Sequence, residues 1–343
     1  MDDTVRLSLT EVHDLARAVC LAHGCSRAQA EAIAATVTAA ERDACASHGL
    51  FRIPFYVDVI AGGTVAPAAE PGIADLAPGV IGVDGGLGFA PLALQVGAAP
   101  LAERARCLGV AALCVTRVVH VAALWPEVER LAEQGLVAFA FTAAIDYVAP
   151  AGGTRPLFGT NPMAFGWPRA GQPPLVWDQA SSASARGEIQ LCLRDGKPIP
   201  EGWAIGPDGQ PTTDPATALA GAQLPFGGHK GSSIALMVEL LAGALVGDLF
   251  SFEARAADRA DTGAPQGGEF MLAIDPARCV RDGDRAAQLA RGELLFDRLL
   301  DQEGTRLPGQ RRLAARERTA REGITIPARL HATLQALRAG PGT

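Results

Sequence analysis

A serine and a histidine are neighbours in the segment Ser47-His48-Gly49, and Arg52 follows four residues after the histidine. Histidine titrates near neutral pH and is the commonest general acid or base in enzymes. A guanidinium group binds a carboxylate through two parallel hydrogen bonds. If this segment forms a helical turn, His48 and Arg52 face one cavity, where an acid/base group would lie beside an anion-binding group. The alternative is that His48 is an ordinary polar residue of a loop.

A serine next to a histidine also raises the possibility of a serine hydrolase. The pattern G-x-S-x-G, which places the nucleophile of many hydrolases on a sharp turn, does not occur in the chain. Adjacent residues on a regular element point apart, so Ser47 and His48 are poorly placed as nucleophile and base. The sequence therefore argues against nucleophilic catalysis by serine.

The loop at 224–231 reads Leu-Pro-Phe-Gly-Gly-His-Lys-Gly and leads into a long apolar run. Backbone N–H groups at a helix N-terminus bind anions, and His229 and Lys230 add positive charge. Lys230 is followed by glycine, so the loop is not a Walker A motif. The loop is either an anion site or a glycine-rich cap for a core helix.

Two further turns combine glycine and proline with polar residues. The segment 159–162, Gly-Thr-Asn-Pro, is typical of a tight turn, and the open question is whether its polar side chains have a further role. The segment 306–312, Arg-Leu-Pro-Gly-Gln-Arg-Arg, places three arginines around a Pro-Gly turn. Such a cluster either binds a phosphate group or lies in solvent.

The elements that must position these groups alternate between helices and strands. Helical apolar spacing with Gly24 as C-cap, and a capping box from Ser26 to Gln29, predict two helices before residue 42. Further helices are predicted from Pro54, over 91–107, 124–134, 230–246 (buried) and 285–301, and in the tail. Strands are predicted over 80–83, 110–115, 136–142, 175–177, 188–193 and 270–274, and loops over 148–162, 202–214 and 252–268. The alternation predicts an α/β or α+β protein.

The glycine fingerprint of doubly wound dinucleotide-binding folds is missing. That fingerprint, G-x-G-x-x-G, lets a pyrophosphate approach a helix N-terminus closely. The nearest string is Gly-Gly-Leu-Gly-Phe-Ala at 85–90, which lacks the third glycine. The local pattern alone does not predict a nucleotide-binding protein.

Composition limits the partners of the protein. The chain has 343 residues, enough for two or three domains, and a formal net charge of −7, which argues against a nucleic-acid partner. Its seven cysteines are scattered without a C-x-x-C pair, which argues against disulfides and zinc and indicates a reducing compartment. We find no secretory signal, and the most apolar run is too short for a membrane span. A cytoplasmic protein without a metal is expected.

Five strings in the same order resemble the malate/L-lactate dehydrogenase family that is distinct from the Rossmann-type lactate dehydrogenases. They are SHGLFRIPFY (47–56), HVAALWPEVE (120–129), PLFGTNPMAFGWPRAG (156–171), LPFGGHKGSSIALMVELLAG (224–243) and RLPGQRR (306–312). Within that family, HVAALWPEVE, LPFGGHKGS and FSFE (250–253) are most similar to the cyclic imino acid reductases. The strings cover most of the chain.

The resemblance implies a sulfolactate dehydrogenase-like NADP-binding fold, with a largely antiparallel sheet flanked by helical domains, in a homodimer. The expected division is a helical domain of residues 1–70 with 305–343, an NADP-binding sheet domain of 71–180 with 265–304, and a mostly helical domain of 181–264. A fold of this kind would explain the missing glycine fingerprint.

The resemblance also implies a set of site residues. Ser47, His48 and Glu188 would form a charge relay, with Glu188 where the reductases carry aspartate, and Arg52 and Thr160 would contact the substrate. The implied cofactor contacts are His120, Val121, Ala122, Ala123, Leu124, Asp178, Gln179, Ala180, His229, Lys230, Arg306, Gly309, Arg311 and Arg312.

The implied reaction is reduction of the C=N bond of a small cyclic imino acid to an L-amino acid. The substrate would be of the Δ1-piperideine-2-carboxylate or Δ1-pyrroline-2-carboxylate type, the product of the L-pipecolate or L-proline type, and the cofactor NADPH, with NADH possible. The alternatives are a 2-keto acid/2-hydroxy acid dehydrogenase and a ligand-binding homologue without activity. Departures from the reductase pattern, which predict a roomier and less polar pocket, occur at Val118, Val119, Val121, Ala143 and Ala151.

Overall fold

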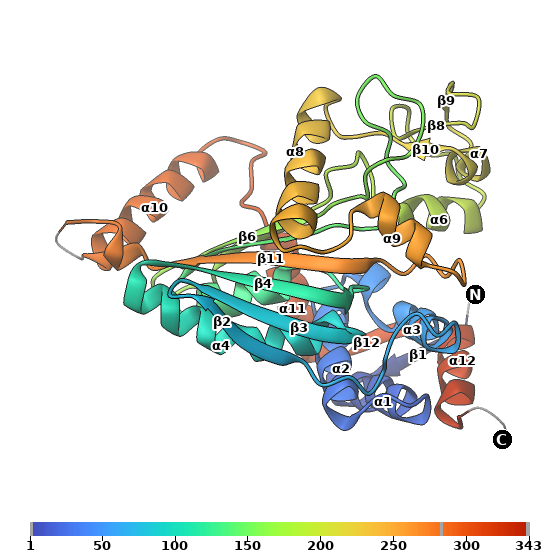
Figure 1. Ribbon diagram of the computed structural model, residues 1–343, viewed down its shortest axis with the longest axis horizontal. Coiled ribbons are helices and arrows are strands. Elements are labelled where there is room, and N and C mark those ends of the chain that lie inside the picture. Colours follow the sequence, from blue (N-terminus) through green and yellow to red (C-terminus); the bar gives the residue numbers. More distant parts are fainter. Residues whose placement is uncertain (1–2, 282–283, 341–343) are drawn as a thin grey trace.

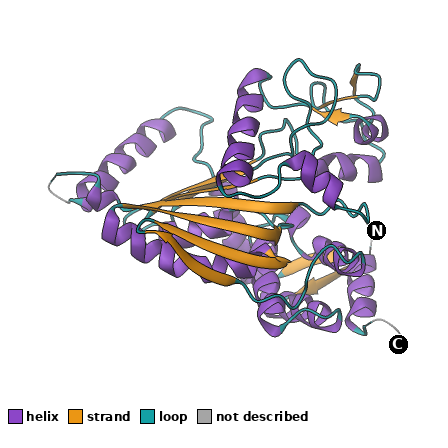
Figure 2. Ribbon diagram, in the orientation of Figure 1, coloured by secondary structure: helices purple, strands orange, loops and turns teal. Residues whose placement is uncertain are grey.

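A seven-stranded sheet forms the centre of the computed structural model, which describes residues 3–281 and 284–340 (Figure 2). The strand order is β2-β3-β4-β11-β5-β6-β7. Strands β3 and β4 run parallel, and the remaining neighbours in this sheet run antiparallel. The bounds are β2 Gly72–Ala77, β3 Val80–Phe89, β4 Val110–Val119, β5 Val137–Thr142, β6 Met163–Trp167, β7 Leu175–Gln179 and β11 Gln266–Ile274. The expected largely antiparallel sheet is confirmed.

Helices cover both faces of this sheet (Figure 1). Helices α4 (Ala90–Leu108) and α5 (Trp125–Glu133) pack on one face, where Leu101, Leu113 and Leu131 are buried in one core. Helix α8 (His229–Glu239) and a π-helical segment, Leu240–Leu245, pack on the other face against Phe141 and Phe270. Because the central strands are covered on both sides, they read in the sequence as continuous apolar runs.

The two ends of the chain fold together into a helical unit (Figure 1). Strands β1 (Thr4–Leu7) and β12 (Ile324–Pro327) pair antiparallel. Val12, Ile33, Tyr56 and Leu334 share one core. The helices are α1 Leu9–Ala22, α2 Arg27–Arg42, α3 Ile53–Ala61, α11 Gln310–Glu322 and α12 Ala328–Arg338.

A third region lies on the same side of the sheet as α8 (Figure 1). It has a small core of its own, made by Ile189, Ile199, Ala204 and Ala218. Its elements are α6 Arg186–Arg194, α7 Pro215–Ala220, α9 Ser251–Ala257 and the short strands β8 Ala204–Ile205, β9 Pro211–Thr212 and β10 Ala222–Gln223. The remaining helix, α10 (Arg285–Leu300), projects from the opposite end of the sheet (Figure 1).

Three predictions about single elements are wrong. Residues 188–193 form part of α6 and not a strand, because Ile189 and Cys192 pack into the small core at a helical spacing of three. Residues 252–268 are not a loop but hold most of α9 and the start of β11. The helix at 230–246 is buried on one side only, since Leu236, Leu240 and Leu245 are 49%, 51% and 59% exposed.

Strand β2 could not be predicted from hydrophobic alternation because all of its residues are exposed at the edge of the sheet. None of the helices among the described residues is long and apolar enough to cross a membrane.

A buried ionic network connects the end of α2 with α5 and α11. The side chain of Asp43 is fully buried and accepts hydrogen bonds from Arg42, Arg316 and the indole of Trp125. Arg316 also pairs with Glu129 at 3.0 Å. A buried charge is tolerated only when its partners satisfy it, so each group in this network depends on the others.

We expect Asp43→Ala to lower the free energy of unfolding by roughly 3–5 kcal/mol, because it removes the buried anion of the network and leaves the half-buried guanidinium groups of Arg42 and Arg316 with Glu129 alone. Urea denaturation measures this loss. The matched control is Asp75→Ala, which removes the partner of Arg104 where the carboxylate is 73% exposed, and it should cost less than about 1 kcal/mol. Equal losses in the two variants would contradict the structural role of Asp43.

Candidate active site

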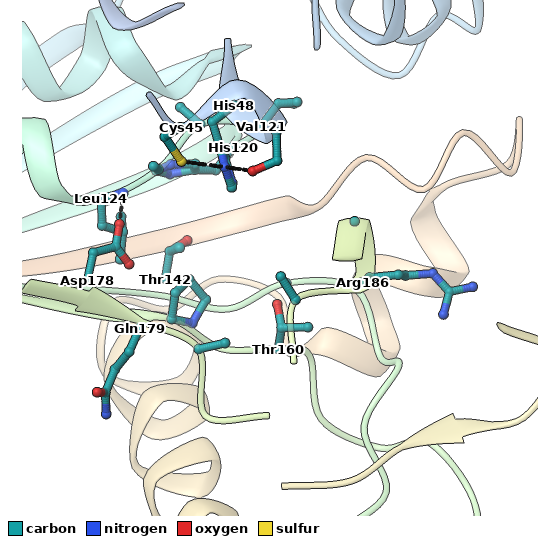
Figure 3. A pocket seen from close by; sticks show the side chains of 18 of the residues that line it. Cys45, His48, His120, Val121, Leu124, Thr142, Thr160, Asp178, Gln179 and Arg186 are labelled. Carbon is teal, nitrogen blue, oxygen red and sulfur yellow. Dashed lines mark hydrogen bonds between the residues drawn. The ribbon is translucent and has the colours of Figure 1, made fainter. Parts of the chain in front are cut away.

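A cavity of about 580 Å³ lies where the sheet, the helical unit and the third region meet (Figure 3). Two short turns, two strand ends and the turn before α11 contribute to its wall. The predicted site residues that line it are Ser47, His48, Arg52, His120, Val121, Ala122, Ala123, Leu124, Thr160, Asp178, Gln179, Ala180, Arg306, Gly309, Arg311 and Arg312. Segments far apart in the sequence thus meet around one space.

Ser47 and His48 lie on a 3-10 turn, Ala46–His48, directly after α2. The Ser47 hydroxyl is 3.1 Å from Nδ1 of His48, and the thiol of Cys45 is 3.6 Å from the same nitrogen. The turn is anchored by buried Glu41, whose carboxylate accepts a 2.7 Å hydrogen bond from the backbone N–H of Leu50. A Cβ atom on Gly49 would lie 2.2 Å from that carboxylate, so glycine is required there.

Arg52 ends the following 3-10 turn, Leu50–Arg52, and lies beside the histidine turn. Its Nε donates a 2.8 Å hydrogen bond to the backbone oxygen of Ser47, and its guanidinium lies 5.8 Å from the centre of the Phe55 ring. Among the described residues no carboxylate pairs with this guanidinium. Its charge is therefore available to an anionic ligand in the cavity.

The environment of His48 favours the neutral imidazole. Burial, followed by the positive charges of Arg52 and His120, lowers the pKa of His48 to about 4. At pH 7 the ring therefore carries one proton, and its second nitrogen accepts hydrogen bonds.

The loop 120–124 is held in place by Asp178, at the end of β7. One carboxylate oxygen of Asp178 accepts hydrogen bonds from the backbone N–H groups of Leu124 and Trp125, at 2.8 and 3.1 Å (Figure 3). These are orphan donors of the first turn of α5, so Asp178 acts as a cap from another strand. The cap fixes the backbone that lines this side of the cavity.

The turn at 306–312 packs against β7 at the same end of the cavity. Arg312 donates a 2.7 Å hydrogen bond to the backbone oxygen of Val176 and lies 4.9 Å from the ring centre of Trp125. Gly309 has φ +83°, and a Cβ atom there would lie 2.6 Å from the Val176 oxygen. This close approach requires glycine and places Arg306 and Arg311 on the cavity wall.

Thr160 reaches the cavity because the next residue is buried. Asn161 adopts a positive φ of 39° and has no exposed surface. Its amide donates a 2.7 Å hydrogen bond to Glu239 of α8, and its side-chain oxygen accepts one of 3.1 Å from the backbone of Ala144. The turn 159–162 is therefore locked into the core by its asparagine and presents its threonine to the cavity.

Three predicted site residues do not line the cavity. Glu188 is exposed on α6, whose cavity face is formed instead by Arg186, Gly187 and Gln190. The structure therefore does not bring the predicted acidic member of the charge relay to His48. His229 and Lys230 are exposed at the start of α8 and are not among the residues that line the cavity.

Comparisons with known proteins identify the family of this chain. The sequence profile of the malate/L-lactate dehydrogenase family matches residues 7–335. The chain belongs to that family. It is 52% identical, over 97% of its length and 99% of the relative, to a Δ1-pyrroline-2-carboxylate/Δ1-piperideine-2-carboxylate reductase of Pseudomonas aeruginosa.

Two solved structures of this malate/L-lactate dehydrogenase type share the fold. The Δ1-piperideine-2-carboxylate reductase of Pseudomonas syringae superimposes with a TM-score of 0.92 at 41% identity, covering 97% of this chain and 99% of the other. A sulfolactate dehydrogenase of Methanocaldococcus jannaschii superimposes with a TM-score of 0.86 at 26% identity, covering 97% and 96%. The predicted family and fold are confirmed.

Dehydrogenases of this family imply a nicotinamide cofactor, and the cavity fits such a group. Its volume lies within the range of cofactor sites, roughly 300–1,000 Å³. Three arginines, at 306, 311 and 312, line it, and guanidinium groups of this kind suit the phosphates of such a cofactor. Val121, Ala122, Ala123, Ala180 and Gly309 also line the cavity, and their small side chains let a large ligand approach the backbone closely.

Several residues that line or back this cavity had no recognisable pattern in the sequence. Arg186 lies with its guanidinium 3.7 Å from the ring centre of Tyr147, and both line the wall near Thr160. Glu269 of β11 is buried behind His120. Their contacts join segments far apart in the chain, which a local pattern does not reveal.

We expect the imidazole of His48 to titrate with a midpoint near pH 4. Because this pKa lies below the ordinary value of about 6.5, the unfolded chain binds more protons between these two pH values, and His48 makes the protein less stable as the pH falls through that window. NMR titration of isotope-labelled histidine measures the midpoint, and the resonance is assigned by its absence in His48→Asn. A midpoint of 6.5 or higher would show that the ring is not shielded from solvent as described.

Proposed function

We propose that the protein reduces the C=N bond of a small cyclic imino acid, of the Δ1-pyrroline-2-carboxylate or Δ1-piperideine-2-carboxylate type, to the L-amino acid with NADPH. The observation that carries this proposal is the placement of neutral His48 and of Arg52, which pairs with no carboxylate among the described residues, in one cavity that Arg306, Arg311 and Arg312 also line. The reductases of Pseudomonas aeruginosa and Pseudomonas syringae, which are similar over nearly the whole chain, support the choice of substrate class.

Arg52 binds the substrate carboxylate. Its hydrogen bond to the Ser47 backbone and its packing on Phe55 fix the guanidinium before substrate arrives. The pre-set position matters because orienting two reactants lowers a barrier by several kcal/mol, about 7–11 in the best cases. Thr160, on the opposite wall, limits the positions that the ring adopts.

His48 stabilises the protonated form of the C=N nitrogen. Since its ring is neutral at pH 7, its free nitrogen accepts a hydrogen bond from an iminium N–H. Ser47, 3.1 Å from Nδ1, helps to orient the ring. The nicotinamide cofactor, when bound, supplies the hydride that adds to the C=N carbon.

The cofactor is assigned to the end of the cavity near α11. Arg306, Arg311 and Arg312 supply three guanidinium groups there, which suits NADPH because its extra 2′-phosphate adds negative charge that NADH lacks. The loop 120–124 and residues 178–180 line the remaining wall. The predicted contacts of His229 and Lys230 with the cofactor stay predictions.

We also propose that the protein is a cytoplasmic homodimer. The exposed apolar side chains of Leu236, Leu240 and Leu245 on one side of α8 and its π-helical extension support a protein contact there. All seven cysteines are free, which suits a reducing compartment.

The direct test is NADPH oxidation with Δ1-pyrroline-2-carboxylate and Δ1-piperideine-2-carboxylate, compared with pyruvate and oxaloacetate. We expect turnover of the imines to exceed that of the keto acids, and His48→Ala to reduce turnover by a factor on the order of 100 to 10,000. Preference for the keto acids would instead assign the protein to 2-hydroxy acid chemistry. Full activity of the alanine variant would remove His48 from the mechanism.

A second substitution separates binding from chemistry. Arg52→Ala should raise KM for the imino acid by roughly tenfold or more, as expected when a charged hydrogen bond of about 1.5–3 kcal/mol is lost. The matched control is Arg298→Ala on the projecting helix α10, where the side chain is exposed, and its KM should not change. An unchanged KM in the Arg52 variant would rule out the proposed carboxylate contact.

A further inference from the structure

A buried carboxylate lies at the junction between α8 and the π-helical segment that follows it. Glu239 is the last residue of α8, and its exposed fraction is 4%. Its partners are a side-chain amide, a hydroxyl and a backbone N–H group, and no cation pairs with it among the described residues. A buried charge without a counter-ion is tolerated only where hydrogen-bond donors satisfy it.

The donors that converge on this carboxylate come from two other segments. The amide of Asn161 donates to Oε1 of Glu239 at 2.7 Å, and the hydroxyl of Ser251, the first residue of α9, donates to the same oxygen. The backbone N–H of Ser251 donates to Oε2 at 3.0 Å. Because a carboxylate only accepts hydrogen bonds, it fixes the direction in which the Ser251 hydroxyl points.

The hydroxyl of Ser251 passes this constraint to the residue before Thr160. With its hydrogen directed at Glu239, its oxygen accepts a 2.9 Å hydrogen bond from the backbone N–H of Gly159. Gly159 has no space for a side chain, since a Cβ atom there would lie 2.6 Å from the backbone oxygen of Ala144. The chain is therefore held tightly just before Thr160.

Asn161 holds the chain on the other side of Thr160. Its side chain is fully buried and donates to Glu239, while its backbone has a φ of +39°. A residue other than glycine stays in that left-handed region only when its surroundings hold it there. The backbone oxygen of Thr160 itself accepts a 2.8 Å hydrogen bond from Ser181, and Thr160 lines the cavity (Figure 3). The position of Thr160 is thus set by its neighbours on both sides.

We propose that Glu239 and Ser251 are positioning residues for the substrate, which act by holding Thr160 at one place on the cavity wall. This inference rests on the proposed function, in which Thr160 limits the positions of the imino acid. Neither Glu239 nor Ser251 is among the residues that line the cavity, so both act through the turn at 159–162. Their effect should therefore appear in substrate binding.

A role in stability alone would have a different kinetic signature. A destabilised variant contains less folded enzyme, which lowers the apparent kcat and leaves KM unchanged. A displaced Thr160 instead weakens binding of the substrate and of the transition state alike, which raises KM and leaves kcat unchanged. The two constants therefore separate positioning from stability.

The test uses Ser251→Ala, which removes the hydroxyl and keeps the backbone N–H that donates to Glu239. We expect KM for Δ1-pyrroline-2-carboxylate and Δ1-piperideine-2-carboxylate to rise by roughly two- to tenfold, as the net loss of one hydrogen bond implies, with little change in kcat. The matched control is Ser26→Ala, which removes a side-chain hydrogen bond from the backbone N–H of Gln29 at the start of α2, and its KM should not change.

A double-mutant cycle with Thr160→Ala tests whether Ser251 acts through the threonine. Thr160→Ala alone should raise KM, and adding Ser251→Ala should raise it little further, because the side chain that Ser251 positions is already gone. Glu239→Gln keeps the shape but puts an amide donor beside the donors of Ser251, so it should also raise KM. It serves as the second variant where Ser251→Ala does not fold.

Two outcomes would overturn the inference. One is an unchanged KM with a lowered kcat in Ser251→Ala, which indicates a role in stability alone. The other is an equal rise in KM on adding Ser251→Ala with and without the Thr160 side chain. A wild type that reduces no imine refutes the proposed function, whereas an active wild type with either of these outcomes refutes only the role of Glu239 and Ser251.

Discussion

The buried carboxylate of Asp43 is the interaction on which the cavity depends. It lies just beyond α2, two residues before Cys45, and its partners Trp125 and Arg316 stand at the start of α5 and in α11. Burial alone would raise its pKa, but hydrogen bonds from Arg316 and Arg42 lower it. One ionised group thus fixes the start of the 46–48 turn and the start of α5. It also holds α11, the helix that follows the turn at 306–312.

This arrangement explains why distant segments form one site without a continuous motif. Three segments carry the residues of the Asp43 network, and each includes or closely neighbours a residue of the cavity wall. These wall residues are Cys45, Trp125 and Arg312. His48 and Arg312 are separated by most of the chain, so their relative position depends on how α2 packs on α11. A small error in that packing would move one relative to the other. The cost of burying Asp43 is offset by its ion pairs with Arg42 and Arg316 and its hydrogen bond from Trp125.

What the sequence predicted well is local. Caps at Ser26 and Gly24, the spacing of His48 and Arg52, and the Pro-Gly turn at 306–312 are all written in neighbouring residues, and the structure places them as those signals indicate. Even so, His48 and Arg52 share the cavity through two 3-10 turns broken at Gly49, and not through one regular helical turn.

What it did not predict depends on tertiary pairing. Glu269 contacts a residue 149 positions away because β11 inserts between β4 and β5, and no pattern near either residue encodes that insertion. The face of α6 that meets the cavity is set by packing of Ile189 into a separate core, which turns Glu188 outward. The glycines of β3 likewise serve packing, since a Cβ atom on Gly88 would lie 2.4 Å from the Gln29 amide.

The two histidines of the cavity lie in opposite electrostatic environments. His48 is surrounded by Arg52 and His120, which disfavour its protonation, whereas His120 is backed by Glu269, which favours it. Environments that push two titratable groups apart mark their separate roles. A positive charge on His120 would further disfavour protonation of His48, after burial and Arg52. In the proposed reaction the neutral ring accepts a hydrogen bond from the iminium N–H, and a carbonyl oxygen, which carries no hydrogen, would offer this acceptor no donor.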